Sequence, residues 1–213
     1  STGDLAPDGV EVMAYRSNVP AIAEFTLRHR DPDFRKRLKE WGSGFIVAGD
    51  NYGQGSSREH AALAPLHLGV KAVIAKSFAR IHRRNLLAQG IVPLTFSDES
   101  DYDKAEVGQK WSMPKLREEL ENGSETITAK IDDSDELKLS NDFSEHEREI
   151  LLAGGLLSYL REGESGNGAS GKAEAGGGRA EQEDAGERAE SEDDDSGEGV
   201  IRESGQGVGG HHE

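Results

Sequence analysis

Three short apolar runs, separated by two stretches of helical character, constrain the fold of this chain most. The runs are Phe45–Ala48, Val70–Ala75 and Ile91–Phe96. The first intervening stretch predicts a helix from Ser56 to about Leu68. The second predicts a helix with Ser77 as its N-cap and Gly90 just past its end. Because strands alternate with helices, we expect the strands to pair in parallel within an α/β domain and to supply its core.

Composition limits where the folded part of the chain ends. Residues 161–213 contain 15 acidic and 5 basic residues, 14 of the 27 glycines and none of the 12 aromatic residues. A segment of this kind cannot bury enough apolar surface to offset the entropy of ordering it. We therefore expect a folded domain over residues 1–160 and a disordered acidic tail over residues 161–213.

The second half of the predicted domain does not continue the alternation of strands and helices. Ser124–Ile131 and Glu136–Ser140 are typical of a β-hairpin with an acidic turn between them. Ser144 and Glu147 have the spacing of a capping box, which predicts the start of a last helix. The helical spacing of Ile150, Ala153, Gly154 and Leu157 continues that helix.

Several classes of function are disfavoured by what the chain lacks. It has no cysteine, hence no thiol nucleophile and no thiolate ligand for zinc or an iron–sulfur cluster. It contains no apolar run long enough for a membrane span and no secretory signal, so we expect a cytoplasmic protein without membrane contact. Its net charge of −16 makes nucleic acid an unlikely ligand. No cluster of metal ligands is expected, because His60 and His82 have no partner at ligand spacing.

The segment Gly53–His60 carries the candidate chemistry, because it joins a predicted buried strand to a predicted helix. Glycines allow a tight turn, and the start of a helix offers unpaired N–H groups to an anion. Ser56, Ser57 and Arg58 follow the glycines, and a guanidinium can bind a carboxylate through two hydrogen bonds. The alternative is structural, because Ser56 and Glu59 also match an ordinary capping box.

Four ordered blocks resemble the C-terminal swivel domain of the aconitase family. Asn51–Leu63 resembles the active-site signature of that domain, and three further blocks resemble its neighbouring motifs. These blocks are Arg16–Asn18, Lys76–His82 and Pro93–Phe96. The resemblance covers about residues 1–160. It implies a three-layer β/β/α swivelling domain with a mostly parallel βαβαβ core.

The resemblance also implies an activity and roles for named residues. Aconitases of the tricarboxylic acid cycle are hydro-lyases that interconvert citrate and isocitrate through cis-aconitate. In this family Ser56 would be the catalytic base, while Arg16, Ser57 and Arg58 would bind the carboxylates of the tricarboxylate substrate. A [4Fe–4S] cluster would be held by other domains or by a large partner subunit. This chain, a fragment or small subunit, would bind no metal itself and would be inactive alone.

Three points stay open on the sequence. Gly3 stands where the family usually has aspartate, and Asp4 is the nearest acidic residue that could replace it. The small subunits of isopropylmalate or homoaconitate isomerases use the same domain, but their loop generally has cysteine at the position of Gln54. A noncatalytic RNA-binding or assembly module is a further alternative. It would use the basic cluster of Arg80, His82, Arg83 and Arg84, which we interpret instead as a solvated face that also makes an inter-domain contact.

Overall fold

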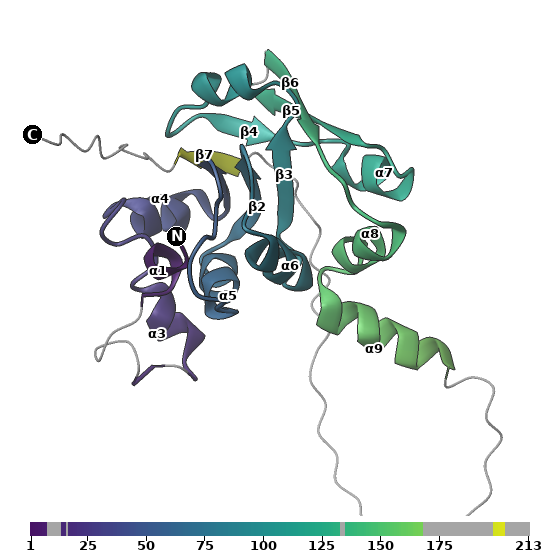
Figure 1. Cartoon of the computed structure of the whole chain (residues 1–213), viewed down its shortest axis with the longest axis horizontal. Coiled ribbons are helices and arrows are strands. Elements are labelled where there is room, and N and C mark those ends of the chain that lie inside the picture. Colours follow the sequence, from purple (N-terminus) through teal and green to yellow (C-terminus); the bar gives the residue numbers. More distant parts are fainter. Residues whose placement is uncertain (8–13, 16, 133–134, 168–197, 203–213) are drawn as a thin grey trace, which may run out of the picture.

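A curled mixed β-sheet organises the molecule (Figure 1). The computed structural model describes residues 1–7, 14–15, 17–132, 135–167 and 198–202. The strands are β1 Gly44–Ala48, β2 Val70–Ala75, β3 Val92–Phe96, β4 Lys110–Ser112, β5 Thr126–Ile131, β6 Asp135–Ser140 and β7 Glu198–Arg202. Their order is β1-β2-β3-β6-β5-β4-β7, and β7 closes the sheet by pairing with both β4 and β1.

The sheet has a parallel part and an antiparallel part. β1, β2 and β3 pair in parallel, which confirms the predicted βαβαβ unit. β6 pairs with β3 in the opposite direction, and β5 and β4 continue the antiparallel part. The α/β fold class is therefore confirmed, and the parallel strand pairs of the described residues are β1–β2, β2–β3 and β1–β7.

Helices pack around the curled sheet, with α1, α3, α4 and α5 gathered on one side of β1 and β2 (Figure 1). The helices are α1 Thr2–Leu5, α3 Val19–Ala23, α4 Phe34–Trp41, α5 His60–His67, α6 Arg80–Ala88, α7 Leu116–Glu121, α8 Glu145–Leu152 and α9 Leu156–Asn167, with a 3₁₀ helix η1 over Glu99–Lys104. None of the described helices combines the length and the apolar character that crossing a membrane requires.

Both faces of the parallel strands are buried, which explains why their sequences are continuously apolar. Side chains alternate along a strand. Ile46 and Ala48 therefore join the cluster beneath α1, α3, α4 and α5, whereas Phe45 and Val47 join a second cluster enclosed by the curled sheet. Fully buried Trp111 belongs to this second cluster. The side chains predicted for the core are at most 7% exposed, as expected for strands covered on both faces. They are Phe45, Ile46, Val47, Ala48, Val73, Ile74, Leu94 and Phe96.

The last predicted helix is interrupted. It forms two helices, α8 and α9, because Gly154 and Gly155 adopt φ angles of +81° and +120°, which a right-handed helix cannot contain. Ser144 caps α8 as predicted, with its hydroxyl accepting from Glu147 N. α9 continues past the predicted domain boundary at residue 160 to Asn167, and β7 comes from the predicted tail. The rest of that tail lies outside the described residues, so the boundary remains a prediction.

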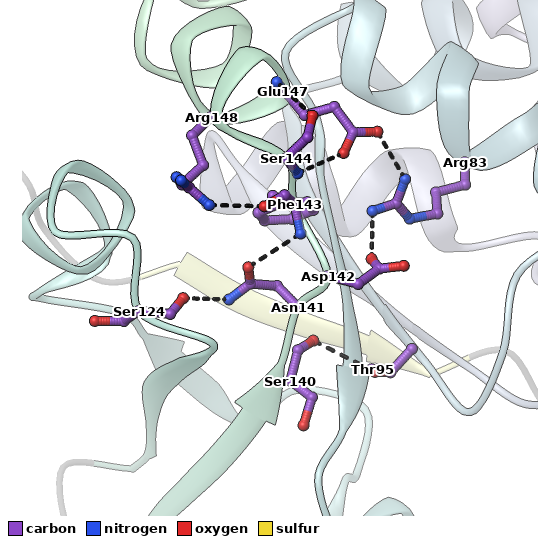
Figure 2. A network of polar contacts seen from close by, with 10 residues as sticks. All are labelled: Arg83, Thr95, Ser124, Ser140, Asn141, Asp142, Phe143, Ser144, Glu147 and Arg148. Carbon is purple, nitrogen blue, oxygen red and sulfur yellow. Dashed lines mark hydrogen bonds and ion pairs between the residues drawn. The ribbon is translucent and has the colours of Figure 1, made fainter.

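A polar network joins α6 to the segment that leads from β6 into α8 (Figure 2). Arg83 of α6 forms ion pairs with Asp142 and with Glu147, the latter at 3.0 Å. Asn141 Nδ2 donates to Ser124 O at 2.9 Å and holds the other side of the segment. Partial burial alone would raise the pKa of Glu147, but hydrogen bonds from Ser144 N and Arg83 outweigh burial and lower that pKa.

Replacing Arg83 tests how much this network stabilises the fold. Arg83→Gln should reduce the free energy of unfolding at pH 7 by about 1 kcal/mol, because Glu147 and Arg83 are only partly exposed. A carboxylate with a lowered pKa stabilises the fold above its unfolded pKa and loses this effect as the pH falls through the folded pKa. The difference between the two proteins should therefore narrow below about pH 4.

The measurement is urea denaturation at neutral and acidic pH. Arg84→Gln is the control, because Arg84 is exposed on the same helix and the change in charge is identical. Equal losses in the two variants would mean that net charge, rather than the ion pairs, determines the effect.

Candidate active site

Two loops lie side by side at the carboxyl ends of β1 and β2. The β1–α5 loop contains the candidate motif, and the β2–α6 loop supports it from the neighbouring strand. Tyr52 N donates to Ser77 O at 2.9 Å, and Ala79 N donates to Tyr52 O at 2.9 Å. Ser77 Oγ accepts from Asn51 N at 2.8 Å, so Ser77 holds the loop instead of capping α6, which begins at Arg80 after the N-cap Ala79. The motif therefore occupies the edge where α/β sheets usually bind ligands.

The two glycines of the loop are required by its geometry. Gly53 and Gly55 have φ angles of +81° and +113°, in the region that side chains disfavour. A Cβ on Gly55 would lie 2.8 Å from Thr2 Oγ1, and a Cβ on Gly53 would lie 2.1 Å from the ring of His82. The loop thus turns sharply while its backbone packs against side chains from α1 and α6.

Thr2, near the N-terminus, holds the loop in place through two hydrogen bonds. The sequence did not indicate this role. Thr2 N donates to Gln54 O at 2.8 Å, and Thr2 Oγ1 donates to Ser56 O at 2.9 Å. Only 2% of Thr2 is exposed. In the sequence, only the position of Thr2 beside Gly3 in the opening segment pointed to a role in the site. A contact between residues 54 positions apart leaves no local sequence pattern.

Ser56 is exposed in the loop and is not a helix cap. The predicted capping box does not form, because α5 begins later, at His60, with Glu59 as its N-cap residue. The Glu59 carboxylate accepts instead from Gln89 Nε2 at 3.0 Å. Ser56 and Ser57 are both exposed, and within the described part of the chain their hydroxyls make no hydrogen bond. Two hydroxyls are therefore available to a ligand at this turn.

Arg58 is half-buried and directly follows the two serines in the sequence. Its Nη1 donates to Ala6 O at 2.9 Å, which connects the loop to the segment after α1. A Cβ on Gly3 would lie 3.9 Å from Arg58 Nη1, so the position where the family usually has aspartate lies next to this guanidinium. The carboxylate of Asp4 accepts instead from Ser1 Oγ at 2.7 Å and from Arg30 Nε at 3.4 Å. Asp4 therefore binds a different arginine.

Arg16, the remaining predicted site residue, lies outside the described residues. Ser57 and Arg58 line one cavity, and Ser56 is exposed beside them in the sequence. The roles of all four residues stay predictions.

His82 belongs to the buried floor of the site, so its interpretation as part of a solvated basic face is wrong. Only 2% of the residue is exposed, and both ring nitrogens are buried without a hydrogen-bond partner. Its ring lies 5.3 Å from the ring of Tyr52, measured between centroids. Burial lowers the pKa of His82 to about 4, so the imidazole is neutral at pH 7. The sequence did not reveal this position, because the loop that covers His82 belongs to an earlier part of the chain.

The described residues offer no place for a metal ion. No group of three or more histidine, aspartate or glutamate side chains converges among them, and the sequence has no cysteine. Thiolates are the ligands of an iron–sulfur cluster, so these residues do not fit such a cluster. The groups of the candidate motif that can act on a ligand are the hydroxyls of Ser56 and Ser57 and the guanidinium of Arg58.

Comparisons with known proteins identify relatives of this chain. Residues 24–99 match the model of the aconitase C-terminal domain. A probable mitochondrial aconitate hydratase of Dictyostelium discoideum is 42% identical over 163 residues, which cover 75% of this chain and 18% of that protein. The mitochondrial aconitate hydratase of Gracilaria gracilis is 44% identical over 133 residues, which cover 61% of this chain and 17% of that protein. The chain thus spans about a sixth of the length of these relatives.

A solved structure matches over nearly its full length. The crystal structure of 3-isopropylmalate dehydratase from Methanocaldococcus jannaschii superposes with a TM-score of 0.64 at 32% identity, covering 80% of this chain and 91% of that one. The sequence match and the shared fold lead to the same family. The chain belongs to the aconitase C-terminal, or swivel, domain family.

Proposed function

We propose that this chain is the swivel domain of an aconitate hydratase-type hydro-lyase that interconverts citrate and isocitrate through cis-aconitate. The observation that carries the proposal is the exposed pair of serine hydroxyls beside the half-buried guanidinium of Arg58. Identities above 40% to proteins named as aconitate hydratases support this choice of substrate.

One residue of the loop transfers the proton, and its neighbours bind the substrate. Ser56 takes the proton from the substrate carbon, because its hydroxyl is exposed and unpaired among the described residues. Ser56 acts as an alkoxide, whose negative charge the donors of the turn and Arg58 stabilise before the transfer. When the alkoxide takes the proton it becomes a neutral hydroxyl, and the negative charge passes to the substrate. Ser57, Arg58 and Arg16 bind carboxylates, since a tricarboxylate needs several fixed donors to hold one orientation.

The iron–sulfur cluster belongs to a partner in this proposal. A [4Fe–4S] cluster bound by other domains, or by a large subunit, would act as a Lewis acid on the substrate hydroxyl. This chain would close over it and contribute the loop. A cytoplasmic location also stays a prediction, and the relatives named above are described as mitochondrial.

A separate small subunit of an isopropylmalate or homoaconitate isomerase is the second candidate. The solved 3-isopropylmalate dehydratase chain favours it, because this chain covers 91% of that protein as a domain of similar size. Gln54 opposes it, because its exposed amide stands where those subunits generally have cysteine.

A substrate comparison distinguishes the two candidates. The chain is assembled with the cluster-bearing domains of a related aconitate hydratase from which the swivel domain has been removed. The ultraviolet absorbance of the alkene formed by dehydration then follows turnover, with cis-aconitate formed from citrate or isocitrate and the corresponding unsaturated diacid formed from 3-isopropylmalate. We expect kcat/KM for citrate or isocitrate to exceed that for 3-isopropylmalate by at least about tenfold, because unpaired polar groups penalise the wrong substrate.

The cluster-bearing domains alone provide the background rate in this assay. A preference for 3-isopropylmalate would establish the second candidate. Turnover of neither class, together with RNA affinity that survives at physiological salt in a filter-binding assay, would favour the noncatalytic module.

A further inference from the structure

A cavity of about 300 Å³ lies between the candidate loop and the first turn of α6. It is lined by Thr2, Asn51, Gly53, Gly55, Ser57, Arg58, Ala79, Arg80, Ile81, His82 and Asn85. Ser57 and Arg58 belong to the proposed substrate-binding set, whereas Arg80 and His82 have no role in it. Ser56 does not line the cavity, so its hydroxyl lies outside it.

The charge of this cavity is opposite to that of the chain. Arg58 and Arg80 line it, and no acidic residue is among the described residues that do. The net charge of the whole chain is −16. Glu59, the nearest acidic residue in sequence to Arg58, is engaged by Gln89. A concave site with two guanidinium groups concentrates positive potential and attracts anions.

The start of α6 adds polar donors to the same wall. α6 has nine residues, and its N-cap residue is Ala79, which has no side chain able to accept from the first turn. The first N–H groups of a helix have no intrahelical partner and stabilise negative charge. Because Ala79, Arg80 and Ile81 line the cavity, these donors border it.

A buried side chain without a partner is a second and independent sign of a missing ligand, and an exposed arginine lines the same cavity. Within the described part of the chain, Arg80 makes no hydrogen bond or ion pair. Arg83, less than one helical turn further, is paired with two carboxylates. His82 has both ring nitrogens buried and unpartnered. Buried polar groups are normally hydrogen-bonded, so an unpartnered imidazole at the floor of a cationic cavity indicates a site for a polar ligand.

We propose that this cavity receives one carboxylate arm of a di- or tricarboxylic acid, and that Arg80 is a specificity-determining residue for it. The inference rests on the proposed function, since Ser57 and Arg58 bind the same substrate. Arg58 and Arg80 approach the carboxylate from the loop and from α6. A carboxylate held there positions the rest of the acid toward Ser56, outside the cavity.

The first test measures binding to the full chain without turnover. Tricarballylate, a tricarboxylate that cannot undergo the reaction, is titrated while NMR follows the His82 ring and the Ser57 amide. We expect saturable shifts of both signals. Arg80→Gln should weaken the affinity about tenfold or more, because a charge-assisted hydrogen bond is lost. Arg80→Lys should weaken it less, since the charge remains but the two-pronged geometry is lost.

Arg84→Gln is the matched control, because it removes the same charge from an exposed position of α6 that does not line the cavity. Its affinity should equal that of the parent chain. Equal affinities in Arg80→Gln and Arg84→Gln would overturn the assignment, and so would the lack of any saturable shift. Inorganic phosphate is titrated in parallel, and binding as tight as that of tricarballylate would overturn the carboxylate specificity.

A second readout separates this inference from the proposed function. In the assembled enzyme, Arg80→Gln should raise KM about tenfold with a smaller change in kcat, whereas a merely structural role would lower the melting temperature and the amount of active enzyme. If the assembled enzyme turns over none of the acids, the proposed function fails. The dependence of tricarballylate binding on Arg80 still decides the inference in that case.

Discussion

In the enzyme assembled with a cluster-bearing partner, Ser56→Ala is expected to lower kcat about a thousandfold and to change KM little. A positioned general base contributes about 10²–10⁴-fold to the rate, and alanine removes the only proton acceptor of this side chain. The fold should tolerate the change, because the Ser56 hydroxyl is exposed and makes no hydrogen bond within the described residues. The contact from Thr2 uses the backbone carbonyl of Ser56, which the substitution keeps.

Two serine variants make this prediction specific. Ser57→Ala should mainly raise KM, because Ser57 lines the proposed carboxylate cavity and is not the base. Ser158→Ala, on α9 and remote from the loop in sequence, should leave both parameters unchanged. Steady-state kinetics of all three variants, each with its cluster content determined, is the measurement. Normal kcat in Ser56→Ala would remove the base assignment.

The parallel half of the fold could be predicted because its signals are local. Three apolar runs alternate with helices, and nearly every position of each run is buried, with Lys71 as an exposed exception, so composition alone marks the strands. The closure of the sheet could not be predicted in this way. It depends on β4, a three-residue strand, and on β7, which comes from a segment poor in apolar residues.

The predicted starts and ends of helices were wrong where a contact between residues distant in sequence determines the local backbone conformation. Ser56 and Ser77 both have good N-cap character, yet each lies in a loop, because the two loops bond to each other and to Thr2. The break between α8 and α9 has a similar cause. A Cβ on Gly90 would lie 2.6 Å from Gly154 O, so the end of α6 packs against the residues that interrupt the helix.

The motif could identify the loop residues but not the groups that complete the site. Ser56, Ser57 and Arg58 are adjacent in sequence, so one motif contains all three. Arg80 and His82 come from the next helix, and their charges resembled those of an ordinary solvated face. Only the fold shows that His82 turns inward beneath Gly53 and that Arg80 reaches the same cavity as Arg58.

Gly53→Ala should have the largest effect on stability of any single methyl added to the loop. The new Cβ would lie 2.1 Å from His82 Cδ2 and 2.4 Å from His82 Cβ, at a φ of +81°. The ring cannot move away freely, because it is buried against Tyr52. Strain at positive φ costs about 1 kcal/mol, and overpacking costs about 1–3 kcal/mol more. We therefore expect a loss of about 3 kcal/mol in the free energy of unfolding.

Gly42→Ala isolates the contribution of the contact with His82. Gly42 has a φ of +80°, and a Cβ there would meet nothing within 4 Å, so it carries the backbone strain without the clash. It should lose only about 1 kcal/mol in urea denaturation and keep its activity when assembled. The Gly53→Ala enzyme should also lose about a hundredfold in kcat/KM, because a shift of about 1 Å in the loop misplaces the Ser56 hydroxyl. Equal stability losses in the two variants would mean that His82 yields to the new methyl group. The imidazole would then not be the rigid floor on which the loop is built.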